Sequence, residues 1–163
     1  ILGDVMAKFE KTNVMRILDQ KKIDYLFHSY LDTGAISGIE VANVLGQDPN
    51  RVFKTLVTIG SSKNYYVFLV PVCSELNLKK AAKSVNEKSI EMIKSKDLLS
   101  LTGYIHGGCS PIGMKKFFTT IIDESAILYE SIIFSGGKIG YQVELSLGEL
   151  DKVIEYKLDD ICG

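Results

Sequence analysis

One segment of the sequence concentrates residue types that could bind a negatively charged group. Residues 103–116, GYIHGGCSPIGMKK, contain four glycines and one proline, so no regular helix or strand is expected there. Consecutive glycine amides in such a loop can form an anion-binding nest. The P-loop pattern fails, because Gly113 is followed by Met114 and Lys115 and then by the strand-like sequence FFTTII. An ATPase is therefore not expected.

Two side chains of this segment could take part in catalysis or metal binding. His106 and Cys109 lie three residues apart, which suits a nucleophile and its base or half of a metal site. A catalytic cysteine usually meets its histidine through the fold, and two ligands do not complete a zinc site. Cys109 is more simply interpreted as a small apolar residue, and neither a metal nor another cofactor is expected.

A lysine in a predicted strand is the second candidate. Lys54 shares one face of the strand 52–59 with Val52 and Leu56, an apolar row in which an ammonium group is costly unless it is paired. Either the lysine stem covers the sheet edge or the ammonium has a task in a site. The sequence leaves both interpretations open. It contains no G-x-S-x-G, H-E-x-x-H or G-x-G-x-x-G motif, which argues against common hydrolases, metalloproteases and dehydrogenases.

Five more lysines could follow a phosphate backbone if the fold brings them together. An interpretation as ordinary solvated lysines is equally open, and the net charge of −1 argues against a protein that binds polyanions through bulk positive charge. These candidates are Lys79, Lys80, Lys83, Lys115 and Lys116.

A single mixed α/β domain with a largely antiparallel sheet must position these residues. The helix starts are marked by Thr12 as an N-cap and by capping boxes at Ser37–Glu40 and Ser146–Glu149. The turn residues 60–64 predict a hairpin between two β-rich runs. The expected helices are one from 13 to near the Lys21–Lys22 pair and those at 38–45, 78–85, 96–101 and 147–154, and the expected strands are 25–30, 52–59, 65–72, 89–93, 117–122, 131–135 and 139–145.

The composition limits where this domain works. The longest strongly apolar stretch, 65–73, is too short for a membrane span, which needs about 20 residues. Three widely spaced cysteines without a C-x-x-C pair favour a reducing cytoplasm. We expect Met6 to be the native start, residues 1–5 to be an expression remnant, and 6–163 to form the domain.

Four motifs, taken together, resemble the YbaK/EbsC family of aminoacyl-tRNA deacylases, which are related to the editing insertion domain of bacterial prolyl-tRNA synthetases. The resemblance runs from about Thr12 to the C-terminus. It implies a barrel-like sheet with flanking helices, in a free-standing domain that clears mischarged tRNA in trans. The motifs are FKTLV (53–57), LNLKKAAK (76–83), GY-x-x-GG-x-SP-x-G-x-KK (103–116) and SGGK (135–138).

Within this family, the chain looks most similar to the subgroup that removes cysteine from tRNA(Pro). Lys54 followed by Thr55 matches that subgroup, whereas alanine-clearing relatives tend to have asparagine after the lysine. Tyr30 matches an aromatic residue of the subgroup's pocket, and Ser135 with Gly136 matches its other wall. The chain departs from the pattern at His106 and Cys109, where relatives more often have apolar residues.

The resemblance implies roles for these residues and for the substrate. Lys54 would bind the terminal phosphate or the developing negative charge, with the Gly107 and Gly108 amides as further electrostatic groups. The remaining implied substrate-binding residues are Tyr30, Thr55, Ser110, Ser135 and Gly136. The thiol of a cysteinyl substrate could attack its own carbonyl and leave as a cyclic thioester.

The implied partners are the acceptor end of tRNA and prolyl-tRNA synthetase, which would supply specificity for tRNA(Pro). Two alternatives stay open. One is a deacylase for alanine or another small amino acid, and the other is a non-catalytic module that binds tRNA or a synthetase.

Overall fold

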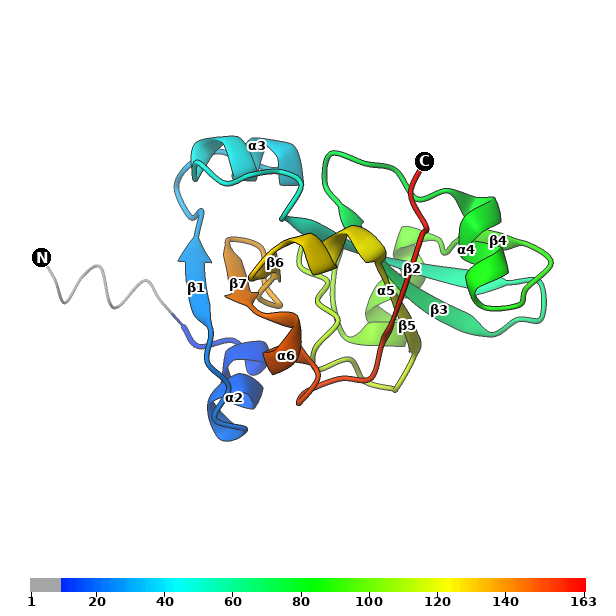
Figure 1. The fold of residues 1–163 in the computed structure, drawn as a ribbon. Helices are drawn as coiled ribbons and strands as arrows, with labels where there is room; N and C mark the ends of the chain where they lie inside the picture. The colour runs from blue at the N-terminus through cyan, green and yellow to red at the C-terminus, as the bar shows by residue number, and fades with distance from the viewer. Residues whose placement is uncertain (1–9) are drawn as a thin grey trace, which may run out of the picture.

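The computed structural model describes residues 10–163, whose strands form two separate sheets (Figure 1). The expected start at Met6 and the expected remnant 1–5 lie outside the described residues. The smaller sheet has the order β1–β7–β6, and the larger has the order β4–β2–β3–β5–β8. The strands are β1 Leu26–Ser29, β2 Phe53–Gly60, β3 Tyr65–Pro71, β4 Ile90–Met92, β5 Thr119–Asp123, β6 Ile132–Ser135, β7 Tyr141–Leu145 and β8 Lys157–Asp159.

Strand pairing is largely antiparallel, as the sequence predicts. The smaller sheet is antiparallel throughout, and β2 pairs antiparallel with both β3 and β4. Two pairings, β3 with β5 and β5 with β8, are parallel. The expectation of a barrel-like sheet is wrong, because the two sheets are joined only by one isolated bridge, between Val52 and Ile133, and do not close into one surface.

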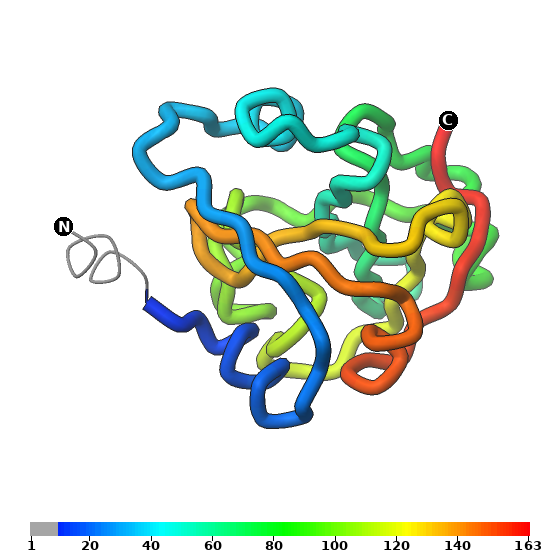
Figure 2. The backbone as a smooth tube through the Cα atoms, turned by 60° about the vertical axis from the view of Figure 1, so that its left-hand side comes forward, coloured from blue at the N-terminus to red at the C-terminus, as the bar shows by residue number. Residues whose placement is uncertain are grey.

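The larger part of the hydrophobic core lies between the two sheets. β2 contributes Phe53 and Val57 to this core. They are four residues apart, and because side chains alternate between the two faces of a strand, both project from the same face. Phe134 and Val143 enter the same cluster from the smaller sheet. Figure 2 shows β1 in blue running beside β7 in orange, in keeping with their pairing. Burial of these apolar faces holds the two layers together.

A second cluster covers the other face of the larger sheet. Phe68 and Val70 of β3 are fully buried there against Ala81 and Ala82 of helix α4, Leu78–Ser84. The remaining helices are α2 Asn13–Gln20, α3 Gly38–Val44, α5 Ser95–Thr102 and α6 Leu147–Leu150, with a 3₁₀ helix η1 at Glu124–Leu128. No helix in the described part of the chain is long and apolar enough to cross a bilayer.

The predicted caps of two helices are confirmed. The Thr12 hydroxyl accepts a hydrogen bond from the Met15 amide at 3.2 Å and begins α2. Before α3, Ser37 and Glu40 form a complete reciprocal capping box. Gly103 ends α5 in the left-handed conformation, with φ of 86°, where glycine is favoured.

The C-terminal third departs from the expected elements. Ser146 begins α6, but the Glu149 carboxylate accepts a hydrogen bond from the Asp24 amide at 2.9 Å. The helix ends at Leu150 and does not reach 154. The strand expected from 117 begins at Thr119, and neither η1 nor β8 was predicted.

Candidate functional site

A cavity of about 570 Å³ lies where the two sheets meet the glycine-rich segment. Its walls come from seven parts of the chain: the segment after β1, α3, β2, Val72 after β3, the region from β4 into α5, the glycine-rich segment, and the ends of β6 and β7. Of the residues that the sequence singled out, it is lined by Tyr30, Lys54, Thr55, His106, Gly107, Cys109 and Ser135. Segments far apart in sequence therefore form one chamber.

The cavity occupies an unpaired stretch of the edge of β2. The Val72 amide donates to the Val52 carbonyl and the Gly60 amide to the Asn64 carbonyl, both at 2.8 Å, so even-numbered residues of β2 bond to β3. The backbone of Thr55 consequently points to the opposite edge. Along that edge β4 pairs with residues 58–60, and the Ile93 amide donates to the Val57 carbonyl at 3.3 Å. At the other end an isolated bridge joins Val52, just before β2, to Ile133, and no other pairing of this edge is seen in the described residues. The open edge lets side chains from both faces of β2 reach the cavity.

Thr55 presents an unpaired polar atom in this region. Its hydroxyl oxygen is buried and has no hydrogen-bond partner among residues 10–163. A buried hydroxyl without a partner costs free energy, so such a group in a native structure calls for an explanation. Thr55 lines the cavity, but its hydroxyl oxygen is covered by protein atoms in this structure.

Lys54 occupies the other face of β2 from Thr55 and also lines the cavity. Its ammonium nitrogen lies 3.5 Å from a carboxylate oxygen of Glu75, and its side chain is 30% exposed. Glu75 itself is 87% exposed, so the pair lies near solvent and is weak. Lys54 is therefore a lining residue with a weakly paired charge, and its role in a site stays a prediction.

A tight turn places the glycine-rich segment against the cavity. The Gly108 amide donates to the Ile105 carbonyl at 3.0 Å, and Gly107 has φ of 88°. This geometry is that of a type II turn, which favours glycine at its third position. His106 stands at the second position, exposed, at the cavity wall.

Gly108 serves a different purpose from Gly107. It is buried, and a Cβ added to it would lie 3.2 Å from the Ile139 backbone nitrogen and 3.4 Å from the Lys138 backbone. Gly108 does not line the cavity. It allows the turn to pack closely against residues 138–139.

Ser110, Ser135 and Gly136 occupy distinct environments. Ser110 is fully buried, its hydroxyl accepts from the Ile112 amide at 3.3 Å, and it lies outside the cavity lining. Ser135 lines the cavity, and its hydroxyl accepts from the Gly137 amide at 3.1 Å. Gly136 closes the β6–β7 hairpin by donating to the Tyr141 carbonyl at 2.8 Å. Of the three, only Ser135 faces the chamber.

Cys109 is buried, and burial raises the pKa of its thiol to about 12. A thiol with so high a pKa stays protonated near neutral pH and is a poor nucleophile. The interpretation of Cys109 as a small apolar residue fits this environment. Among residues 10–163, no group of three or more His, Cys, Asp and Glu side chains could hold a metal ion.

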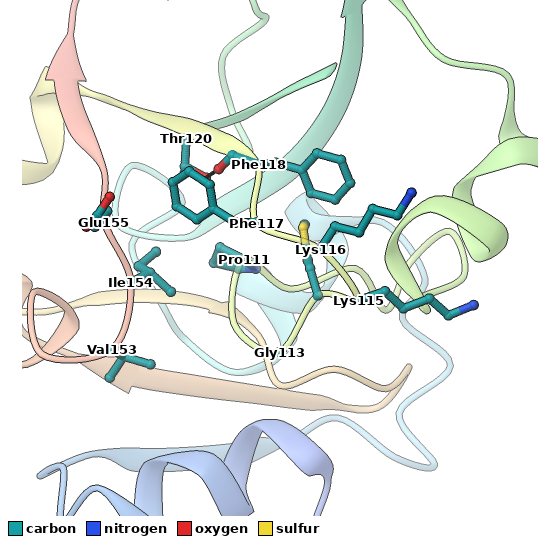
Figure 3. A pocket seen from close by; sticks show the side chains of 11 residues that line it. Pro111, Gly113, Lys115, Lys116, Phe117, Phe118, Thr120, Val153, Ile154 and Glu155 are labelled. Atoms are coloured by element: carbon teal, nitrogen blue, oxygen red, sulfur yellow. Dashed lines mark hydrogen bonds between the residues drawn. The ribbon is translucent and has the colours of Figure 1, made fainter. Parts of the chain in front are cut away.

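The five candidate phosphate-binding lysines do not form one cluster. Lys79 and Lys83 are exposed on α4, whereas Lys80 pairs with Asp160 at 3.0 Å. Lys115 and Lys116 line a second cavity, also of about 570 Å³, whose other walls include residues 153–155. In Figure 3 their side chains extend away from Thr120 and Glu155.

Several residues of the first cavity were not predicted from the sequence. Ile36 and Met92 stand at its rim and are 85% and 47% exposed, respectively. Gln142 of β7 is buried in its wall and pairs with the Gln47 side chain at 2.8 Å. Ile36 lies in a segment without periodicity, so only the fold reveals its place. Gln142 interrupts an apolar strand, which is the one sequence signal that could have marked it.

Comparison with known proteins links this site to tRNA chemistry. The family model of the aminoacyl-tRNA editing domain matches residues 35–153. That range contains every lining residue of the first cavity except Tyr30. An Enterococcus faecalis protein named as a Cys-tRNA(Pro)/Cys-tRNA(Cys) deacylase, EbsC, is 46% identical over 138 residues, which are 84% of each chain.

Two solved structures share the fold. One, described as a trans-editing enzyme for prolyl-tRNA synthetase, has a TM-score of 0.80 with 20% identity, over 94% of this chain and 99% of that one. The other, described only as a hypothetical protein, has a TM-score of 0.81 with 18% identity, over 94% and 100%. At these identities the likeness concerns the fold alone.

Proposed function

Because the chain belongs to the aminoacyl-tRNA editing domain family, we propose that it is a deacylase that acts in trans and removes mischarged cysteine from tRNA(Pro). The activity is the one named for the Enterococcus faecalis relative, which is similar along most of its length. A cytoplasmic location is part of the proposal, because charged tRNA is made and used there.

The observation that carries this proposal is the convergence of Lys54, Thr55, Gly107 and Ser135 on one cavity. Its volume of about 570 Å³ lies within the range of small-molecule sites and suits an aminoacyl group with its terminal nucleoside. The chamber combines one cation, one buried hydroxyl without a partner and glycine backbone. These groups can bind an ester and stabilise negative charge on it.

The chemistry requires little from protein side chains. An aminoacyl ester is already activated, so cleavage depends on placing a nucleophile and stabilising the oxyanion. In our proposal the substrate thiol attacks the carbonyl carbon, the bond to the ribose oxygen breaks, and a cyclic thioester leaves the tRNA. Lys54 and the turn around Gly107 provide the electrostatic stabilisation, while Tyr30 and Thr55 shape the side-chain pocket.

Recognition of the whole tRNA is a separate part of the proposal. The domain is small and its net charge is −1, so it contacts chiefly the acceptor end. Prolyl-tRNA synthetase, bound to the same tRNA, would supply specificity for tRNA(Pro).

A panel of mischarged tRNAs tests these statements. Release of labelled amino acid is measured for cysteine and alanine on tRNA(Pro), with and without prolyl-tRNA synthetase. We expect rapid release of cysteine, slow release of alanine, and stronger preference for tRNA(Pro) when the synthetase is present. Preferential release of alanine would change the substrate, and binding of tRNA without any release would identify a non-catalytic module.

A further inference from the structure

We propose that His106 accepts the proton of the substrate thiol and so generates the attacking thiolate. This inference rests on the proposed function and adds a catalytic side chain to it. Its starting observation is the position of His106 in the wall of the cavity that holds Lys54 and Thr55.

The backbone fixes His106 at this position. The hydrogen bond from the Gly108 amide to the Ile105 carbonyl, at 3.0 Å, closes a turn with His106 at its corner. Gly107 completes the turn with φ of 88°, and Gly108 packs against the backbone of residues 138–139. The imidazole is exposed and lines the cavity, so it has access to both a bound substrate and solvent. A base that exchanges its proton with water can act in successive turnovers.

The other ionisable groups of the cavity are poorer candidates for the base. The Lys54 side chain of β2 is an ammonium group, and the proposed function already assigns it to the negative charge of the substrate. Tyr30 and Tyr141 contribute phenol groups, which are a weaker class of proton acceptor than imidazole. Burial raises the pKa of Cys109, on the same segment, to about 12. No aspartate or glutamate is among the described residues of the lining.

Imidazole has the proton affinity that the step requires. Its ordinary pKa is about 6.5, and that of a cysteine thiol is about 8.5, so only a few per cent of free thiol is ionised at pH 7. In the step, the neutral imidazole takes the S–H proton while sulfur bonds to the carbonyl carbon. The bond from carbon to the ribose oxygen then breaks, and that oxygen takes the proton from the imidazolium. Base and acid roles thus fall to one residue, and no further reactant is needed.

The test compares the wild type with His106→Asn and His106→Ala on Cys-tRNA(Pro) between pH 6 and pH 9, after subtraction of the rate without protein. Asparagine can still form hydrogen bonds but cannot accept the proton. We expect kcat of both variants to fall on the order of 100-fold at pH 6.5, and the deficit to shrink toward pH 9, where the thiol ionises by itself. Added imidazole should restore part of the His106→Ala rate.

A matched control lies in the same turn. Ile105 is 54% exposed and does not line the cavity, so Ile105→Ala should keep the wild-type rate and pH profile. Circular dichroism and thermal melting confirm that each variant is folded.

The outcomes separate this inference from the proposed function. An active wild type whose rate and pH profile persist in His106→Asn would overturn the role of His106 alone. A deficit that stays constant from pH 6 to pH 9, without imidazole rescue, would mean that His106 merely supports the turn. A wild type that releases no cysteine at any pH would overturn the proposed function and this inference together.

Discussion

At the scale of single residues, the cavity depends on a few groups whose surroundings set their chemistry. Lys54 is a half-buried cation whose partner, Glu75, is 87% exposed, so its charge is only weakly compensated in the free protein. Thr55 keeps a buried hydroxyl without a partner. Lys54 can therefore bind a ligand without first breaking a strong internal contact.

Removing the ammonium tests the role of Lys54. We expect Lys54→Ala to lower kcat/KM for Cys-tRNA(Pro) on the order of 100- to 1000-fold, because electrostatic stabilisation of the oxyanion is lost. The melting temperature should stay near the wild-type value, since the ion pair with Glu75 contributes little. Turnover retained by a folded Lys54→Ala variant would remove the lysine from the mechanism.

The ion pair itself predicts a second effect. In the free protein Glu75 competes with a negatively charged substrate for Lys54, from which it is 3.5 Å away. Glu75→Gln should therefore lower KM by about threefold, in line with the small free energy of an exposed pair, and leave kcat within about twofold. Lys152→Ala, which disrupts a salt bridge on α6, serves as the control. A raised KM would show that Glu75 helps to bind the substrate.

At the scale of elements, the turn at 105–108 and the β6–β7 hairpin hold each other in place. We expect Gly108→Ala to lower kcat/KM about tenfold and to destabilise the fold by about 1 kcal/mol, because the added Cβ would press on the rigid backbone near Ile139. Steady-state kinetics and thermal unfolding measure the two effects. An unchanged rate would show that this close packing does not position His106 and Gly107.

A half-buried carboxylate joins the smaller sheet to the start of β2. Glu144 of β7 accepts hydrogen bonds from His28 of β1 at 2.7 Å, from Arg51 at 2.7 Å and from Ser131 at 2.5 Å. Burial by itself would raise the pKa of Glu144, but the hydrogen bonds and the Arg51 charge outweigh it, so the pKa is lowered. The carboxylate is therefore more acidic in the folded state than in the unfolded chain.

This shift predicts how stability depends on pH. A lowered pKa in the folded state gives stability that is present above the unfolded value of about 4.5 and is lost as the pH falls through the lowered folded value. Glu144→Gln should destabilise the protein by about 2 kcal/mol at pH 7, and the difference from the wild type should diminish as the pH falls below 4.5. Urea unfolding of both proteins at several pH values measures this difference in the free energy of unfolding. A difference that does not change with pH would contradict a lowered pKa of Glu144 in the folded state.

The sequence predicts elements well where one local signal decides them. Thr12 and the Ser37–Glu40 box begin helices because their side chains bond amides three residues away. Glu149 shows the limit, since its carboxylate bonds a distant amide at Asp24 and the helix stops one residue later. β8 was not found because all three of its residues are exposed and show no apolar alternation.

The site was partly predictable for the same reason. The motifs identify Lys54, Thr55 and Gly107, all of which line the cavity. Ser110 belongs to the same motif, yet its hydroxyl bonds an amide of its own loop and lies outside the lining. Ile36 reaches the cavity from a segment without any motif. Tertiary packing decides whether Ser110 and Ile36 line the cavity, and the residues next to them in sequence do not reveal that packing.

At the scale of the whole molecule, the basic side chains lie on separate surfaces. Glu75, which pairs with Lys54, precedes α4 by three residues, and Lys79 and Lys83 are exposed on that helix. Lys115 and Lys116 border the other cavity. An RNA whose 3′ end enters the first cavity should therefore meet the α4 lysines first.

Salt dependence measures these contacts. We expect Lys79→Ala/Lys83→Ala to raise KM for the charged tRNA and to reduce the slope of log KM against log salt by about 1.5, which corresponds to two phosphate contacts. Lys115→Ala/Lys116→Ala should have a smaller effect, and its size shows how far the RNA extends over the protein. An unchanged slope in the first variant would exclude α4 from the RNA-binding surface.

The open edge of β2 has an evolutionary consequence. Along residues 53–56 the chamber borders a strand edge whose main-chain groups any amino acid except proline would supply. Substitutions at neighbouring positions such as Thr55 can therefore retune which acyl group fits while the peptide scaffold persists. A single ancestral architecture could in this way give rise to proofreading proteins with different preferences.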